Sequence, residues 1–450
     1  MAGLEDQEFV ILGDKDVEDF NTAGLLPQSP NEIEKIQQWL QPTDFASESS
    51  ECNKHLASYV NGTGKWIQET DQFQQWIKSS NHGTLWIKAV PGAGKSVVAA
   101  QLASQLAKEE KVPVLHFFFR QIITTNKTPR SLVQDWMSQV LEYSPVLQSK
   151  LKGFLENNRS LESVAFDELW DNLVIALGSL PRVYCIADAL DEMDMGNESF
   201  LRQLVSLRTR FPSSVKVLMT SRPLPRIETV LNDASVLQIP LRLPLIDYDI
   251  AIYVRSRLSA IELPEETKSA IQKTIRSKSQ GLFLYARLMM DDLIDSDKIH
   301  IDLIQDALVK LPSGLSDMYA AILLDHSKRS GVPQELQFLI LQFVTHSSRP
   351  LRLLELASMV DFVKNTTHLN LVLTATGVPQ ETKSIVRAGC GPLLEILEDE
   401  TISVIHQLRA TLFFWPKLRV LRFISFMSLS LELIHVLQLA TYSSLSSPFV

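Results

Sequence analysis

The chain has few cysteines and no excess of basic residues. Its 450 residues include only Cys52, Cys185 and Cys390, whose wide separation fits neither a disulfide framework nor the paired spacing of a zinc site. A reducing compartment is the simple inference. The 43 Lys and Arg residues stand against 52 Asp and Glu, which gives a net charge of −9. Because a nucleic-acid surface normally needs positive charge, we expect no nucleic-acid partner.

Secretion and membrane signals are also lacking. Residues 1–8 are acidic and do not show the charged-then-apolar order of a signal peptide. The most apolar stretch, residues 420–440, is interrupted by Arg422, Glu432 and His435, which argues against a membrane span. No segment repeats with a period of 20–50 residues, which excludes a solenoid or a propeller. We therefore expect a cytoplasmic protein and do not expect a membrane among its partners.

What the sequence does contain is a glycine loop between a predicted strand at residues 85–90 and a predicted helix that begins near residue 95. The loop ends in Gly-Ala-Gly-Lys-Ser, the phosphate-binding end of a P-loop of general form G-x-x-x-x-G-K-[ST]. Its glycines let backbone N–H groups approach phosphate oxygens, its lysine supplies a full charge to the β- and γ-phosphates, and its serine hydroxyl can bind Mg²⁺. The predicted nucleotide-binding residues are Pro91, Gly92, Ala93, Gly94, Lys95 and Ser96.

Ala89 departs from the P-loop pattern, because it stands where the first glycine belongs. An alanine fits there without strain if φ is negative, whereas a positive φ would cost about 1–2 kcal/mol. A second glycine-rich stretch, residues 61–65, lacks both a preceding strand and a serine or threonine after its lysine, so we interpret it as a turn.

Strand and helix patterns alternate through the first half of the chain, which predicts a doubly wound parallel sheet with its phosphate site at the carboxyl ends of the strands. The predicted strands are 85–90, 112–119, 183–188, 215–223 and 236–241. Helical patterns dominate from residue 247 onward. The candidates are 247–258, 264–277, 282–295, 299–311, 315–327, 334–346 and 350–360. Residues 43–54 are polar and serine-rich, and we interpret them as a linker.

An acidic motif follows the third predicted strand, which ends in Asp188. This carboxylate is expected to hold Mg²⁺ alongside Ser96, although a terminal aspartate can instead cap the next helix. Asp191 and Glu192 come next, and either could orient or deprotonate an attacking water. Ala189 occupies a position where many fast P-loop ATPases carry glutamate, so we expect slow hydrolysis.

Arg222 ends the fourth predicted strand and is expected at the same edge of the sheet. There it could sense the γ-phosphate. A surface arginine that pairs with a nearby acid is an equally good interpretation of the residue taken alone.

Residues 86–96, 188–192 and 220–223 together resemble the NACHT domains of STAND-class signalling NTPases, and most of all those of fungal NOD-like receptor proteins. The resemblance covers roughly residues 60–407, and its last part, residues 349–356, is similar to the winged-helix segment of the family. It implies an α/β P-loop NTPase fold followed by an all-α region with a winged-helix-like segment. The implied domains are 1–60, an acidic and partly disordered leader with a short helix; 61–245, the NACHT domain; 246–330, a helical domain; 331–407, a winged-helix-like domain; and 408–450, an atypical apolar tail.

By this resemblance the chain is a switch that binds ATP or ADP (or GTP) with Mg²⁺ and hydrolyses slowly. Exchange of ADP for ATP would open it, and opened copies would associate with one another and activate an effector protein of unknown identity. The family's winged-helix histidine, which contacts the ADP phosphate, matches His406. After Gln407 the chain departs from the family pattern, and a shifted reading frame or a retained intron is our hypothesis for this change.

Two other functions remain open from the sequence. One is a nucleotide-binding scaffold that no longer hydrolyses, and the other is a metabolic P-loop kinase acting on a small acceptor. The acidic cluster at 188–192 and the long helical second half weigh against the kinase.

Overall fold

The computed structural model describes most of the chain between residues 26 and 404. The described residues are 26–295 without 122 and 212, 315–366 without 348, and 385–386, 390, 393–397 and 399–404. His406, the tail at 408–450, residues 1–25 and the helix expected at 299–311 lie outside them. The described chain divides into two compact units. The first runs to Glu262 and includes Gly281–Leu284, and the second holds Leu263–Gln280 and the residues from Tyr285 onward.

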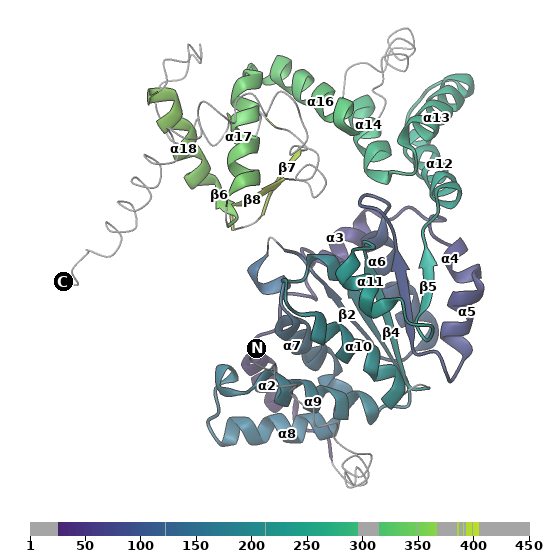
Figure 1. Cartoon of the computed structure of the whole chain (residues 1–450), viewed down its shortest axis with the longest axis vertical. Coiled ribbons are helices and arrows are strands. Elements are labelled where there is room, and N and C mark those ends of the chain that lie inside the picture. Colours follow the sequence, from purple (N-terminus) through teal and green to yellow (C-terminus); the bar gives the residue numbers. More distant parts are fainter. Residues whose placement is uncertain are drawn as a thin grey trace, which may run out of the picture. The chain divides into compact units, whose positions relative to one another are not determined.

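A five-stranded parallel sheet in the order β2-β3-β4-β1-β5 organises the first unit (Figure 1). The strands are β1 (Thr84–Lys88), β2 (Val114–Phe118), β3 (Val183–Asp188), β4 (Val215–Ser221) and β5 (Leu237–Pro240). β3 and β4 are buried along their whole length, which agrees with their mainly apolar sequences. The predicted α/β fold and its five strands are therefore confirmed. β4 lies between the P-loop strand β1 and the acidic-motif strand β3.

Helices cover both faces of this sheet because side chains alternate along each strand. Trp86 of β1 points into one hydrophobic core, whereas Leu85 and Ile87 point into the other. The helices of the first unit that follow β1 are α6 (Lys95–Glu110), α7 (Pro129–Val140), α8 (Pro145–Glu156), α9 (Phe166–Gly178), α10 (Glu198–Arg210), α11 (Pro225–Leu231) and α12 (Leu243–Ser259). Short 3₁₀ turns are η1 (Thr124–Asn126), η2 (Leu141–Tyr143), η3 (Leu161–Ser163) and η4 (Leu190–Glu192).

The residues before β1 are part of the core of this unit. They form α2 (Pro30–Leu40), α3 (Glu51–Ala57), α4 (Trp66–Glu69) and α5 (Asp71–Lys78). Ile36 and Leu40 of α2 are fully buried in the core that contains Trp86. The interpretation of residues 43–54 as a linker is wrong at its end, because the Ser50 hydroxyl accepts the Asn53 N–H and so caps a helix.

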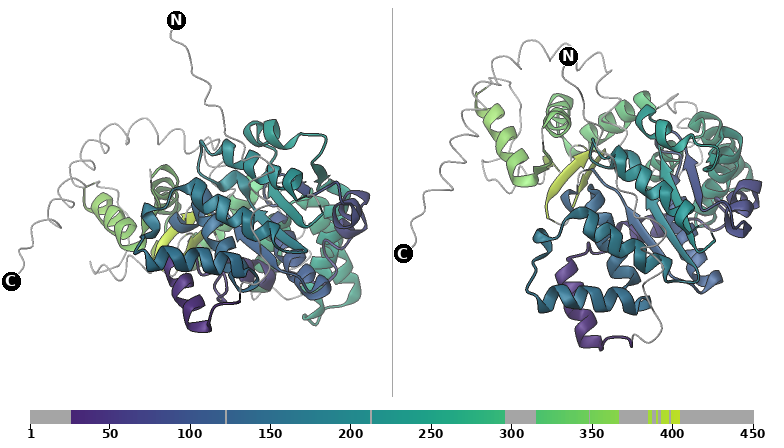
Figure 2. Two further views of the ribbon diagram at one scale, coloured as in Figure 1. Left: turned by 90° about the horizontal axis from the view of Figure 1, so that it is seen from below. Right: turned by 60° about the horizontal axis from the view of Figure 1, so that its bottom comes forward.

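The second unit is mainly helical. Its helices are α13 (Glu265–Ser279), α14 (Phe283–Asp295, whose first two residues belong to the first unit), α16 (Leu315–Ser330), α17 (Gln334–His346) and α18 (Leu353–Thr366). A small antiparallel sheet in the order β6-β8-β7 joins α17 and α18 in a winged-helix-like segment, and Figure 2 shows it beside α18. Its strands are β6 (Leu351–Arg352), β7 (Leu394–Ile396) and β8 (Thr401–Val404).

The helix predicted at 350–360 therefore begins later than expected, because Leu351 pairs with Ile402 in the small sheet. The division of the second half at residues 246, 331 and 408 stays a prediction. Among the described residues, none of the helices combines the length and apolar character that crossing a bilayer demands.

Asp135 of α7 ties the early segment to the domain. Its side chain is 1% exposed. The backbone N–H of Thr43 lies 2.7 Å from one carboxylate oxygen, and the Thr43 hydroxyl lies 2.5 Å from the other. Burial raises the pKa of Asp135 to about 6, even though both hydrogen bonds from Thr43 lower it.

We predict that replacing Asp135 by Asn changes how stability depends on pH. Because the folded-state pKa is above the ordinary value, the stabilisation from Asp135 is full below the unfolded pKa and is lost as pH rises through about 6. The difference in unfolding free energy between Asp135→Asn and wild type should therefore shift by about 1–2 kcal/mol in favour of the variant as pH rises from about 5 to about 7.5. Urea titrations of both proteins at the two pH values measure this gap. A gap that stays constant or shrinks would contradict it.

We also predict that Gly83→Ala destabilises the sheet. A Cβ at Gly83, just before β1, would lie 2.8 Å from the Arg208 Cβ, 3.1 Å from the Arg208 Cα and 3.2 Å from the Val215 carbonyl oxygen. Backbone atoms cannot move aside cheaply, so we expect a loss of about 1–3 kcal/mol in urea unfolding. Gly153→Ala is the matched control. Nothing lies within 4 Å of a Cβ at this position in α8, so it should stabilise by up to about 1 kcal/mol.

Candidate functional site

The glycine loop joins the end of β1 to the start of α6. Gly92 and Gly94 have φ values of 74° and 88°, in the left-handed region that favours glycine. Ala89 is not among the described residues with positive φ, so alanine fits there without strain. The departure from the P-loop pattern at this position has no conformational cost.

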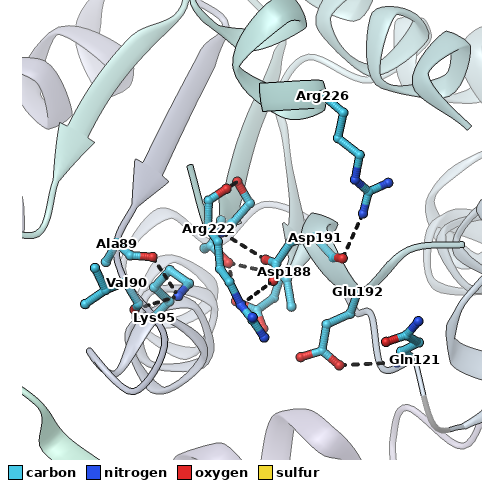
Figure 3. A network of polar contacts seen from close by, with 12 residues as sticks. Ala89, Val90, Lys95, Gln121, Asp188, Asp191, Glu192, Arg222 and Arg226 are labelled. Carbon is cyan, nitrogen blue, oxygen red and sulfur yellow. Dashed lines mark hydrogen bonds and ion pairs between the residues drawn. The ribbon is translucent and has the colours of Figure 1, made fainter. Parts of the chain in front are cut away.

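Lys95 is buried at the start of α6. Its Nζ donates hydrogen bonds to the carbonyl oxygens of Ala89 and Val90, each at 3.1 Å (Figure 3). Burial lowers the pKa of Lys95, and the charges of Asp191 and Asp188 oppose that effect. The ammonium group therefore lies within the electrostatic reach of the acidic motif.

Asp188 is the last residue of β3, and its side chain is almost fully buried. The Thr220 hydroxyl, on the intervening strand β4, donates to Asp188 Oδ1 at 2.5 Å. Burial raises the pKa of Asp188 to about 6, although the neighbouring Ser96 and Thr220 hydroxyls and the charge of Lys95 lower it. The carboxyl ends of β1 and β3 thus come together at one edge of the sheet.

This pair of oxygen groups fits a magnesium site. A carboxylate and a hydroxyl are ligands that Mg²⁺ prefers, and the Ser96 hydroxyl lies close enough to Asp188 to lower the pKa of its carboxyl. The alternative, that Asp188 caps the next helix, does not match the geometry. The turn η4 has Ala189 at its N-cap and no side-chain cap hydrogen bond.

Asp191 and Arg222 form an ion pair at the same edge (Figure 3). Asp191 Oδ2 accepts from Arg222 Nε at 2.8 Å, and Oδ1 accepts from the Arg222 backbone N–H at 2.9 Å. The Arg226 guanidinium donates to the Asp191 carbonyl oxygen at 2.8 Å. Arg222 therefore pairs with an acid, as one interpretation of the sequence had it, and that acid belongs to the predicted site.

Glu192 is held differently. Its Oε2 accepts the backbone N–H of Gln121, which follows β2, at 3.2 Å. The charge of Glu192 also acts on Lys95 and on His55 of α3. Glu192 thus lies between the P-loop and the residues that follow β2.

Ala189 is a strained residue inside this cluster. Its φ is 56°, a left-handed conformation that is costly for a residue with a Cβ, and it is buried. Its N–H donates to the Thr220 hydroxyl at 3.0 Å, which fixes the turn. Backbone strain of this kind is concentrated at functional sites.

The start of α14 also contacts the P-loop. A Cβ placed on Gly94 would lie 3.6 Å from the ring of Phe283, and the Leu284 N–H donates to the Gly92 carbonyl oxygen at 3.4 Å. The Phe283 ring packs edge-on against Tyr253 of α12, with 5.9 Å between centroids. The chain thus returns to the phosphate loop after α13.

The structure gathers most of the predicted site residues, and their roles stay predictions. Those at the carboxyl edge are Pro91, Gly92, Ala93, Gly94, Lys95, Ser96, Asp188, Asp191, Glu192 and Arg222. His406 lies outside the described residues. The sequence interpretation missed Gln121 and the bridging role of Thr220, which lies in the Thr-Ser-Arg-Pro motif. For Thr220, the signal available in the sequence was a hydroxyl near the end of the strand next to β3.

Comparison with known proteins gives matches of two kinds. The family model described as nephrocystin 3, N-terminal, matches residues 62–222. The vegetative incompatibility protein HET-E-1 of Podospora anserina is 27% identical over 363 residues, which is 76% of this chain and 25% of that protein. The chain therefore spans about a quarter of the length of this relative.

Solved structures give weaker similarity. The Walker-type ATPase paby2304 of Pyrococcus abyssi aligns with a TM-score of 0.37 at 13% identity, over 76% of this chain and 94% of that one. The Aeropyrum pernix Orc1 protein, solved in complex with DNA, aligns with a TM-score of 0.35 at 11% identity, over 88% and 94%. At these scores the fold assignment depends on the strand order of this chain itself.

The sequence matches agree with the paired P-loop and acidic motifs at the edge of the sheet. They support a P-loop NTPase similar to the proteins of the fungal NACHT family.

Proposed function

We propose that this protein is a nucleotide-controlled signalling switch that binds ATP or ADP with Mg²⁺ and hydrolyses the triphosphate slowly. The observation that carries the proposal is the meeting of Lys95, Ser96 and Asp188 across β4. A cation, a hydroxyl and a carboxylate at a glycine-rich helix start form the set of groups that phosphate and magnesium together require.

The position and contacts of each residue indicate its proposed role in the site. Backbone N–H groups around Gly94 and the Lys95 ammonium bind the phosphates, and Ser96 and Asp188 hold the metal. Mg²⁺ bound there would neutralise phosphate charge. Both Asp191 oxygens are engaged by Arg222, so Asp191 fixes the arginine. We assign the orienting or deprotonation of the attacking water to Glu192, the next acid in the same turn.

The link between nucleotide and conformation is proposed to run through Phe283 and Leu284. These residues contact the P-loop, and they begin α14, whose remaining residues belong to the second unit. A nucleotide at a thousand times its dissociation constant stabilises the state that binds it by about 4 kcal/mol. Such a bias is large enough to favour one arrangement of α14 over another. Self-association of opened copies and activation of an effector protein complete the proposal.

One observation favours a second function, a nucleotide-binding scaffold without turnover. Ala189 offers no carboxylate directly after Asp188, and Asp191 is committed to Arg222. Denaturing the purified chain and identifying the released nucleotide tests both functions. Tightly held ADP together with slow turnover supports the switch, whereas bound nucleotide with no turnover supports the scaffold. Rapid exchange and many turnovers per minute would instead indicate a metabolic kinase.

Lys95→Ala should abolish nucleotide binding. The variant loses charge-assisted contacts to phosphate, each worth about 1.5–3 kcal/mol. Isothermal titration with ADP and ATP measures the loss. The matched control is Lys108→Ala, a lysine in the last turn of the same helix, which should bind like wild type. A Lys95→Ala protein that retains nucleotide would show that the site is wrongly placed.

Glu192→Gln should lower the rate of hydrolysis by at least about 100-fold, because it removes the group that activates water. Nucleotide affinity should change by less than about threefold, since the phosphate and metal ligands remain. Asp194→Asn is the control, because Asp194 is a partly exposed acid that pairs with Lys127. If Asp191→Asn abolishes turnover while Glu192→Gln does not, the two acids have been assigned the wrong way round.

A further inference from the structure

Helix α3 borders the hydrolytic edge of the sheet, although it lies before the family match at residues 62–222. Its Cys52 is buried in the core that contains Ile186, and the charge of Asp188 acts on its thiol. The ring centroid of His55 lies 5.6 Å from that of Phe118, at the end of β2. The helix therefore packs against the end of β2, beside the strand that leads into the acidic motif.

A buried ion pair joins α3 to the residue after β2. The Glu51 carboxylate lies 2.6 Å from the Arg120 guanidinium, and the two side chains are only 7% and 21% exposed. The other Glu51 oxygen is 3.3 Å from Lys54 Nζ. Arg120 and Lys54 hold the pKa of Glu51 below its ordinary value, although burial raises it. Glu51 is thus a charged group that orients its partner.

Arg120 directly precedes the contact with Glu192. The next residue, Gln121, donates its N–H to Glu192 Oε2 at 3.2 Å. The backbone N–H of Arg120 donates to the Asn126 carbonyl oxygen at 2.7 Å, outside the strand pairing of β2. The Arg120 side chain therefore anchors the point at which the chain leaves the sheet, and the position of the Gln121 N–H depends on that anchor.

The charges of Glu51, Arg120 and Glu192 belong to one cluster, since all three act on His55. Glu51 therefore acts on Glu192 through the chain after β2, because its ion pair with Arg120 fixes the residue that precedes the Gln121 N–H.

We infer that Glu51, through Arg120, is a positioning residue for Glu192, so that the helix upstream of the NTPase domain sets the rate of hydrolysis. The inference rests on the proposed function, because it assumes that Glu192 acts on water. It extends that function by making the segment before residue 62 part of the hydrolytic apparatus.

The test compares Glu51→Gln with a matched variant in the full chain. Glu51→Gln should lower kcat about tenfold, as loss of a supporting contact around a reacting group typically does. Nucleotide Kd should change by less than about twofold, since Glu51 contacts no phosphate-binding residue. The control is Glu32→Gln, because Glu32 also lies before residue 62 and pairs with the domain through Lys152 at 2.5 Å. It should keep the wild-type kcat.

A second variant covers the case in which Glu51→Gln removes a charge that the partly buried Arg120 needs and the protein does not fold. The double variant Glu51→Gln/Arg120→Gln removes both charges, and it should show a similarly reduced kcat with an unchanged Kd. Where both proteins fold, the double variant should be no slower than Glu51→Gln, because the two residues act as one unit.

The outcomes separate this inference from the proposed function. If wild type binds and hydrolyses nucleotide while Glu51→Gln and the double variant keep its kcat, the inference alone is overturned. The inference is also overturned if Glu51→Gln and Glu32→Gln both lose kcat and nucleotide affinity together. Such a result would mean that Glu51 has a purely structural role. A wild-type protein that binds nucleotide without hydrolysis overturns both the inference and the hydrolytic part of the proposal, and absent binding overturns the whole proposal.

Discussion

The hydrogen bond that holds Asp188 is the interaction on which the rest of the site depends. A carboxylate this deeply buried is costly unless it is hydrogen-bonded, and here the Thr220 hydroxyl supplies a partner. Because Thr220 lies on β4, its bond to Asp188 connects the acidic-motif strand β3 to the strand that lies beside β1. The Thr220 hydroxyl also fixes the strained Ala189, from which the acidic turn begins. One hydroxyl therefore positions both the Asp188 carboxylate and the turn that follows it.

The sequence was enough to predict motifs that lie within one continuous stretch of strand, loop and helix. Residues 85–102 and 183–192 carry their chemistry in adjacent positions, so the P-loop and the acidic motif could be recognised from spacing alone. The parallel sheet followed from the alternation of apolar runs with helices. Contacts between distant residues could not be predicted in this way. Glu51 and Arg120 are 69 positions apart, and neither lies in a recognisable pattern.

Short elements were the other source of error. β6 has two residues, too few for alternation to show, and it forms only because β8 pairs with it from about fifty positions away. α3 has seven residues, and its start depends on one hydroxyl, that of Ser50. A polar, serine-rich stretch is typical of a linker, and here one of its serines caps a helix. In the second unit, the long helices were visible because their apolar periodicity extends over several turns.

The burial of α2 has a practical consequence for anyone who expresses the NTPase domain by itself. A fragment that starts at the family boundary, residue 62, would lose Ile36 and Leu40 from the core. It would also leave the Asp135 carboxylate without Thr43. Uncovered apolar surface of this kind promotes aggregation. Fragments for crystallisation or enzymology should therefore start before Pro30, at a point chosen from the packing rather than from the sequence match.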